Sequence, residues 1–278
     1  MIGPKAALAL KSLVGLGTAA GVTAVVATAL VEPVSTPSPT RVTSPWLETP
    51  PQQEGAPYDA RYHFARVQFS TGGGRRGFNG WGGRGRGAPW SHDWPRADRN
   101  FLAILEETTF IDTNRELMNI VSFSDPEIFR YPITYLVEPG FWQPSEDELF
   151  NVGDYLRKGG FLIIDDFRGP RELANLEFYL GQALPELSLL PVEDDHEIFD
   201  TFFRVDPEGL LPPYGGYPPV YYGLFEDNDP SKRMMVMINA NNDIAEYWEF
   251  SDYGYYGIDL SNEAYKVGVN YVVYAMTH

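Results

Sequence analysis

The chain has no cysteine among its 278 residues. This absence excludes disulfide bonds, thiolate metal sites and any cysteine nucleophile, and it is no disadvantage in an oxidising compartment. An apolar fraction of 44%, with 14% aromatic residues, is still enough to build a hydrophobic core. The composition therefore predicts a folded domain without covalent cross-links.

A Walker-type signature of nucleotide binding is missing as well. The glycine-dense loop over residues 71–90 holds four arginines but no Walker lysine. Such a loop resembles RNA-binding RGG segments, but docking against an acidic surface suits an exported chain better, and a solvated insertion is the preferred interpretation. Residues 101–278 contain 32 of the 38 acidic residues, a charge that repels phosphates and attracts cations. We therefore expect no nucleic-acid partner.

A long run without charge occupies residues 12–31, after Lys5 and Lys11. The run ends near the small-residue pattern Ala27-Thr28-Ala29. Residues 1–31 are therefore predicted to be a signal peptide cleaved after Ala29, or a retained transmembrane anchor. Because the positive charges precede the run, both alternatives export the rest of the chain. We expect a bacterial protein that is secreted or anchored facing the periplasm, in contact with the membrane through residues 12–31 if uncleaved.

The next segment, residues 32–57, is rich in proline, serine and threonine. A segment of this composition cannot bury a core and is expected to act as an extended linker. The remaining residues, 58–278, have a suitable length for one larger domain.

Apolar runs and helical periods alternate along this domain. The clearest signal is Ser145 followed by Glu148, a capping box that opens a helix ending at Gly159-Gly160. The apolar strand 161–164 follows directly, and a strand–helix–strand unit of this length implies parallel strands. The predicted fold is a three-layer, doubly wound α/β domain with a mostly parallel sheet. We expect strands over residues 61–70, 117–123, 132–137, 161–164 and 234–239, and helices over 98–108 (capped by Asp98), 145–158, 171–183, 196–203 and 261–276 (capped by Ser261).

Residues 129–167, FRYPITYLVEPGFWQPSEDELFNVGDYLRKGGFLIIDDF, resemble a bacterial family known only as domain of unknown function number four-one-five-nine. Residues 94–107, 195–203 and 266–278 look like the same family. NNDIAEYW, residues 241–248, resembles it more loosely. The order of these motifs identifies the family but not a reaction.

Members of this family are similar to the class I glutamine-amidotransferase scaffold, which is flavodoxin-like. In a true amidotransferase, a cysteine nucleophile follows a central strand. The comparable strand here, FLIIDDF, ends in Asp165 and Asp166, so the resemblance implies the scaffold without amidotransferase activity. Relatives often occur near MoxR-type ATPases and von Willebrand factor A-type proteins, which implies protein partners in the cell envelope.

Asp165 and Asp166 form the first candidate site. Ligands of open α/β sheets bind outside the carboxyl ends of strands. Successive strand residues point to opposite faces, so one aspartate can face the crevice while the other caps the next turn. Two carboxylates can hold a divalent cation or share a proton, and the alternative is an Asx cap on the following loop. If a metal is bound, Asp165 and Asp166 are its predicted ligands; no other cofactor is evident.

A second candidate set follows the predicted strand at 234–239. Asn241, Asp243 and Trp248 supply amide, carboxylate and indole groups of the kind that bind sugars or peptides. The alternative is a turn, since asparagine and aspartate tolerate left-handed backbone. The segment His92-Asp93-Trp94 follows the glycine-rich loop and can project into the same crevice; the alternative is that His92 is simply packed or exposed.

Two other clusters have structural explanations. The acidic residues 194–200 around His196 suit zinc, but they are better explained as the start of a helix. The aromatic segments 214–225 and 247–257 suit a carbohydrate- or protein-binding face, or loops packed over a sheet edge.

Two functions fit these observations. The preferred one is a non-catalytic, envelope-tethered binding domain on an amidotransferase-like scaffold, because the sequence shows no cysteine and no complete catalytic triad. The alternative is a carboxylate- or metal-dependent hydrolase acting on glycan or peptide. Convergence of three or four candidate groups within about 5 Å of a common point would favour the hydrolase, and scatter would favour the binding domain.

Overall fold

The computed structural model describes residues 59–71, 87–115 and 118–278. The predicted signal or anchor segment, the linker and most of the glycine-rich loop lie outside these ranges. In the part of the chain that is described, no helix combines the length and the apolar character needed to cross a membrane.

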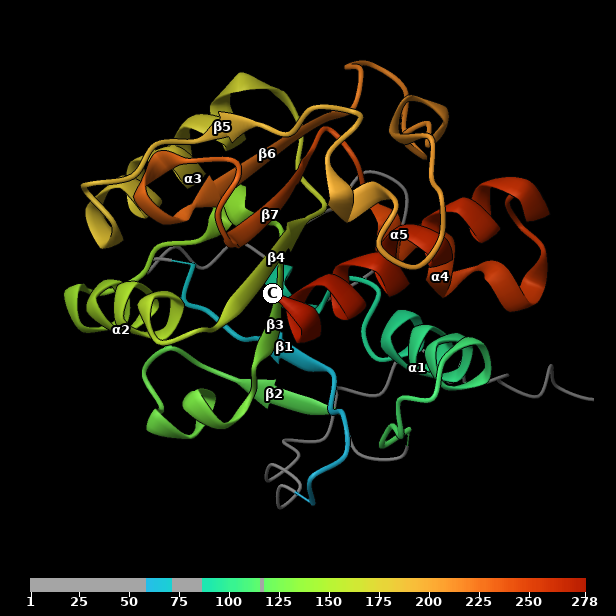
Figure 1. Cartoon of the computed structure of the whole chain (residues 1–278), viewed down its shortest axis with the longest axis horizontal. Helices are drawn as coiled ribbons and strands as arrows, with labels where there is room; N and C mark the ends of the chain where they lie inside the picture. The colour runs from blue at the N-terminus through green and yellow to red at the C-terminus, as the bar shows by residue number, and fades with distance from the viewer. Residues whose placement is uncertain (1–58, 72–86, 116–117) are drawn as a thin grey trace, which may run out of the picture. The chain divides into compact units, whose positions relative to one another are not determined.

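A sheet of seven strands forms the centre of the domain (Figure 1). The strand order is β2-β1-β3-β4-β7-β6-β5. The first five strands of this order run parallel, whereas β6 is antiparallel to β7 and β5 is antiparallel to β6. The prediction of an α/β domain with a mostly parallel sheet is confirmed. The strands are β1 (Ala65–Val67), β2 (Asn119–Val121), β3 (Ile133–Val137), β4 (Phe161–Asp165), β5 (Leu190–Pro191), β6 (Val220–Phe225) and β7 (Met234–Ala240).

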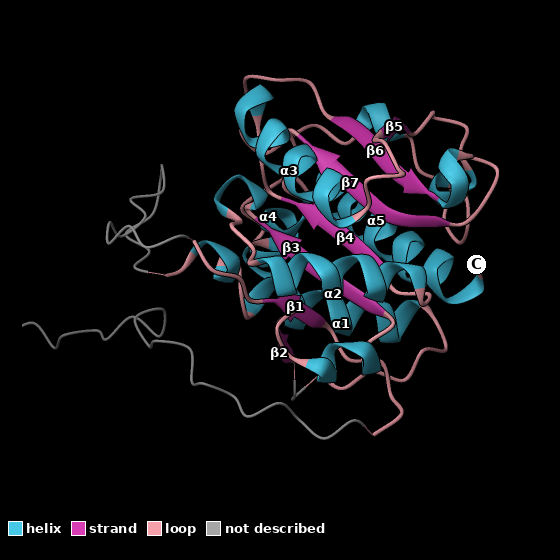
Figure 2. Cartoon of the chain, turned by 90° about the vertical axis from the view of Figure 1, so that its left-hand side faces the viewer, coloured by secondary structure: helices cyan, strands magenta, loops and turns pink. Residues whose placement is uncertain are grey.

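Helices cover both faces of the sheet (Figures 1 and 2). Helices α1, α4 and α5 pack on one face, and α2 and α3 pack on the other. Each face buries its own apolar cluster: Ile163 of β4 belongs to the first cluster, and Leu162 and Ile164 belong to the second. The helices are α1 (Arg96–Thr108), α2 (Glu146–Arg157), α3 (Gly169–Ala183), α4 (Ile244–Glu249) and α5 (Ile258–Thr277).

Helix α2 begins where the capping box predicts. The Ser145 hydroxyl accepts a hydrogen bond from the Glu148 N–H, and the Glu148 carboxylate accepts one from the Ser145 N–H. Two backbone donors at the helix start are thereby satisfied. The strands that this helix connects, β3 and β4, pair in parallel as predicted.

Three local predictions differ from the structure. Asp98 lies inside the first turn of α1 instead of capping it, and Ser261 is buried inside α5. The helix predicted from His196 is only the 3₁₀ turn Glu197–Phe199, with His196 as its cap. In each case, tertiary packing and not local propensity sets the boundary.

The predicted elements also omit β5, β6 and α4. Strand β6 lies in the aromatic segment 214–225, where prolines and glycines obscure the strand pattern. Helix α4 has 6 residues, too few for a helical period to be recognised.

A buried ion pair joins β1 to α1. The Arg66 guanidinium donates to the Asp98 carboxylate through Nε, at 3.1 Å, and through Nη2. Neither side chain is exposed to solvent. The remaining nitrogen, Nη1, donates to the backbone carbonyl of His92 at 3.0 Å. Arg66 therefore holds both α1 and the segment before it against the sheet.

We predict that Asp98→Ala lowers the free energy of unfolding by about 3–5 kcal/mol, because the Arg66 charge then stays buried without its partner. Arg99→Ala is the matched control, since this residue is exposed on the same helix, and its effect should stay below about 0.5 kcal/mol. Urea unfolding followed by circular dichroism measures both values. Equal, small effects of the two substitutions would contradict this role of the pair.

Candidate functional site

The carboxyl ends of the parallel strands meet at one edge of the sheet. The chain passes from β1 to β2 on one side, whereas β3 leads to β4 on the other side, so the strand order reverses between β1 and β3. Open α/β sheets bind ligands in the crevice at such a switch point. Glu138 follows β3 at this edge, Asp166 follows β4, and Asp243 follows β7. The segment after the 3₁₀ helix Pro89–Ser91 adds His92 and its neighbour.

Four residues offer ligand atoms that all lie within 4.8 Å of one another: His92, Asp93, Asp166 and Asp243. His92 Nδ1 lies 2.5 Å from Asp166 Oδ2 and 3.8 Å from Asp93 Oδ1. The three aspartates are buried, whereas the His92 side chain is 37% exposed. The group therefore combines one imidazole with three carboxylates, and the histidine forms its solvent-facing side.

Four residues at this edge have left-handed backbone. They are Asp93 (φ 59°), Glu138 (φ 52°), Asp166 (φ 55°) and Asn241 (φ 61°). A side chain other than glycine in this region costs on the order of 1 kcal/mol, and such residues concentrate at functional sites. Asn241 has a clear structural part, because its amide oxygen accepts a hydrogen bond from the Gly169 N–H at 2.7 Å.

Two aspartates of this group, and Asp165 beside it, have buried oxygens without a hydrogen-bond partner among the described residues. In the ligand-atom group, these buried oxygens without a partner are both oxygens of Asp93 and the Oδ2 atom of Asp243. The other oxygen of Asp243 accepts a hydrogen bond from the Glu246 N–H at 3.0 Å and caps α4. Because a buried polar group without a partner is costly, such groups in a native fold indicate a missing ligand or a functional role.

Burial and repulsion favour protons on the carboxyl groups of this site. Burial, and next the charge of Asp166, raises the pKa of Asp243 well above its ordinary value, and burial does the same for Asp93. Burial and Asp166 also raise the pKa of Glu138 to about 9. Asp93, with help from Asp166, raises the pKa of His92 to about 11. The site thus attracts positive charge, as protons or as a cation.

Asp165 lies outside this group, although it is one of the two predicted metal ligands. Its Oδ2 atom accepts hydrogen bonds from the Tyr135 hydroxyl at 2.5 Å and from the N–H groups of Ile244 and Ala245 at 2.9 and 3.3 Å. Burial raises the pKa of Asp165 to about 6. Asp165 therefore ties β4 to the start of α4, while its neighbour Asp166 enters the group.

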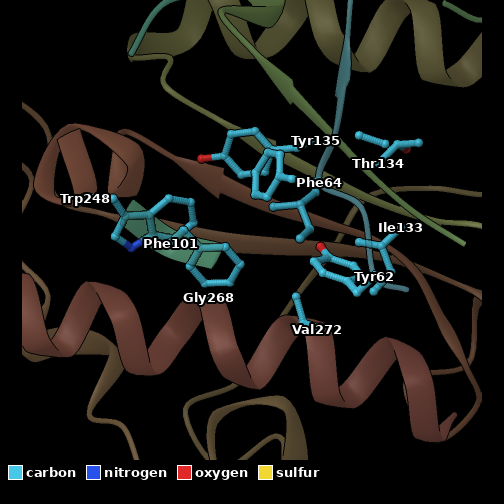
Figure 3. A pocket seen from close by; sticks show the side chains of 11 residues that line it. Tyr62, Phe64, Phe101, Ile133, Thr134, Tyr135, Trp248, Gly268 and Val272 are labelled. Atoms are coloured by element: carbon cyan, nitrogen blue, oxygen red, sulfur yellow. The ribbon is translucent and has the colours of Figure 1, made fainter. Parts of the chain in front are cut away.

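Trp248 lies in the core beside the site. Its ring stacks on Phe101 with 4.5 Å between centroids and lies 5.9 Å from the Tyr135 ring. Figure 3 shows these rings between the sheet and α5, with Gly268 on the helix. Trp94 directly follows Asp93 in the chain and is half-buried. Its indole N–H has no hydrogen-bond partner among the described residues.

A small pocket adjoins the group. Phe167 and Asn242, which are chain neighbours of Asp166 and Asp243, line it. The Arg168 guanidinium lies 4.2 Å above the centre of the Tyr214 ring, and Tyr217 adds a second aromatic wall. The pocket thus offers aromatic faces and a cationic group next to the carboxylates.

The remaining candidates have structural positions. His196 caps its 3₁₀ turn, because its Nδ1 atom accepts a hydrogen bond from a backbone N–H at 3.1 Å. The aromatic segment 214–225 contributes β6 to the sheet. In the segment 247–257, Tyr247 is buried and Tyr253 is exposed.

Several acidic residues at this edge are not among the predicted ligands: Asp93, Glu138, Glu246 and Glu249. The spacing Asp243-x-x-Glu246-x-x-Glu249 is a usable signal, because residues three apart share one face of a helix. The shortness of α4 hides that signal from periodicity arguments.

We predict that the free energy of unfolding of the chelator-treated protein falls as the pH rises from about 5 to about 9. The folded domain keeps a proton on Glu138 up to a pKa of about 9, whereas the unfolded chain loses it near pH 4.5. The raised pKa of His92 acts with the same sign, since its stabilisation is complete below the unfolded-state value and is lost as the pH rises toward 11. E138Q should remove a part of this loss, on the order of a few kcal/mol. Urea unfolding across the pH range in EDTA measures it, and identical pH profiles for E138Q and the unchanged protein would refute the assignment.

Comparison with curated proteins finds no match to this chain. A family model described as "Domain of unknown function (DUF4159)" matches residues 63–276. The match covers more than half of the chain. It includes every strand that the structure describes, and it includes His92, Asp93, Asp166 and Asp243. The resemblance seen in the sequence is confirmed, and the chain belongs to this family of domains of unknown function.

Proposed function

We propose that this domain is a metal-dependent hydrolase that binds a divalent cation through His92, Asp93, Asp166 and Asp243. One observation carries the proposal. Four ligand atoms lie within 4.8 Å of one another, and three buried oxygens of Asp93 and Asp243 have no hydrogen-bond partner among the described residues. This convergence favours an enzyme over a binding scaffold.

The chemistry of the group suits a divalent cation. Carboxylate oxygens are the ligands of Mg²⁺, Ca²⁺ and Mn²⁺, and an imidazole suits Zn²⁺. The mixed set of three carboxylates and one imidazole therefore favours Mn²⁺ or Zn²⁺. A bound cation of this kind activates water or polarises a carbonyl or phosphoryl group. The carboxylate of Asp166 orients the His92 ring through the 2.5 Å contact, and His92 forms the solvent-facing side, from which a substrate would approach.

The adjoining pocket supports a glycan or peptide substrate. The exposed Tyr217 ring provides a flat apolar face against which a sugar ring or a peptide side chain can pack, beside the pair that Arg168 forms with Tyr214. The Arg168 guanidinium can pair with a carboxylate of the substrate. Both substrate classes occur in the bacterial cell envelope.

The finer description of the scaffold and its location belongs to the same proposal. An amidotransferase-like scaffold is supported by the resemblance of residues 129–167 and by Asp165 and Asp166 at the end of β4. Work in the cell envelope, with envelope proteins as partners and membrane contact through residues 12–31, is supported by the N-terminal sequence. A non-catalytic binding domain is the second candidate, because the chain lacks the amidotransferase nucleophile.

We predict that Mn²⁺ or Zn²⁺ raises the melting temperature of the EDTA-treated full chain. At a hundredfold excess over Kd, binding adds about 2.7 kcal/mol, or roughly 5–10 °C for a domain of this size. D243N should lose most of the rise, because the amide keeps the α4 cap but removes a charged ligand. D195N, at an exposed position outside the group, should keep it. The absence of a shift with Ca²⁺, Mg²⁺, Mn²⁺ and Zn²⁺ would sink the cation site.

Hydrolysis is measured separately on cell-wall polymer, through the release of amines and reducing ends. The cation-loaded protein should release fragments, and D243N should release at least about 100-fold less, because a removed ligand weakens the whole centre. Cation binding without any release would instead support the non-catalytic candidate.

A further inference from the structure

A second group of acidic side chains adjoins the first. Asp93, Glu246 and Glu249 also offer ligand atoms within 4.8 Å of one another, so Asp93 belongs to both groups. We propose that the centre is binuclear: Glu246 and Glu249 bind a second divalent cation, and Asp93 bridges the two cations. This inference rests on the proposed function, because the first cation is the one held with His92.

Helix α4 builds both positions. Asp243 caps the helix, Glu246 lies in its first turn, and Glu249 is its last residue, so the spacing of three residues aligns them on one face. Asp165 holds the start of the helix through the N–H groups of Ile244 and its neighbour. The acidic face of α4 is therefore fixed relative to β4. Asp243, at the start of the helix, belongs to the first cation site, and Glu246 and Glu249 belong to the second.

The Asp93 side chain indicates a bound cation by an observation that is separate from the clustering of acidic residues. Its side chain has no exposed surface, and neither of its oxygens has a hydrogen-bond partner among the described residues. A side chain that served as a cap would direct at least one oxygen to a backbone N–H. The backbone of Asp93 is left-handed, and the preceding carbonyl is held by Arg66. The carboxylate is thus held where the two groups meet, and both groups can use it as a ligand.

When all five carboxyl groups are ionised, their charge exceeds what one cation offsets. Arg96 interacts electrostatically with Glu249 and also forms an ion pair with Asp252 at 2.5 Å. One divalent cation offsets two negative charges, whereas two cations offset four. Where a hydrolytic centre holds two cations, the pair can stabilise the attacking water and the leaving group together. The five carboxylates are Asp93, Asp166, Asp243, Glu246 and Glu249.

The test counts bound metal on the full chain. The protein is stripped with EDTA and dialysed against Mn²⁺ alone, and manganese per chain is measured by atomic absorption. We expect two ions in the unchanged protein and one in the double variant E246Q/E249Q. This variant loses both negative charges, while the new amide oxygen at position 246 can still accept the hydrogen bond that Tyr256 donates. E177Q, exposed on α3, is the matched control and should keep two ions. A spin-coupled manganese signal in paramagnetic resonance should appear in the unchanged protein and disappear in the double variant.

Each outcome separates this inference from the proposed function. One ion per chain in the unchanged protein would overturn the binuclear centre and leave the first cation site standing. No bound ion would overturn both. Two ions in E246Q/E249Q would place the second ion elsewhere and overturn the assignment of Glu246 and Glu249. If the double variant fails to fold by circular dichroism, E249Q alone is used, because this half-buried residue ends the helix and should lose the second ion without unfolding it.

Discussion

The position of the candidate site depends on the buried guanidinium of Arg66. This side chain sits on β1, in the interior of the sheet, and binds both the Asp98 carboxylate and the His92 carbonyl. A buried charge must be paired, so the arginine ties α1 and the segment before it to one place. His92 and Asp93 are thereby held at the sheet edge where Asp166 arrives from β4.

At that edge the fold accepts costs that its core must offset. Carboxylates are buried close together, which raises the pKa of Asp93 and Asp243, and several residues adopt left-handed backbone. Two separate apolar clusters, one on each face of the sheet, supply the stability that makes this arrangement tolerable. A proton or a cation at the site would reduce the repulsion between the carboxylates and would also give the unpartnered oxygens a partner. The net charge of −17 makes the surrounding chain attractive to cations as well.

Local signals in the sequence predict the elements that depend on local interactions. The capping box of Ser145 and Glu148 locates α2, and apolar runs locate β3, β4 and β7. Strand β6 is different, because its pairing with β7 and not its own pattern makes it a strand. The site shows the same division. Asp166 and Asp243 are candidates in the sequence because each follows a predicted strand, whereas contacts between residues distant in the chain bring His92 and Asp93 beside them.

The sequence by itself determined three things about this protein: the absence of thiol chemistry, an α/β domain with a mostly parallel sheet, and its family. Only the tertiary structure decided which of the two adjacent aspartates joins the site, since Asp165 turns to Tyr135 and α4. It also decided that His92 meets Asp166, 74 residues away. The physical reason is that strand order and the direction of each side chain from the sheet determine such contacts, and neither is encoded in local periodicity.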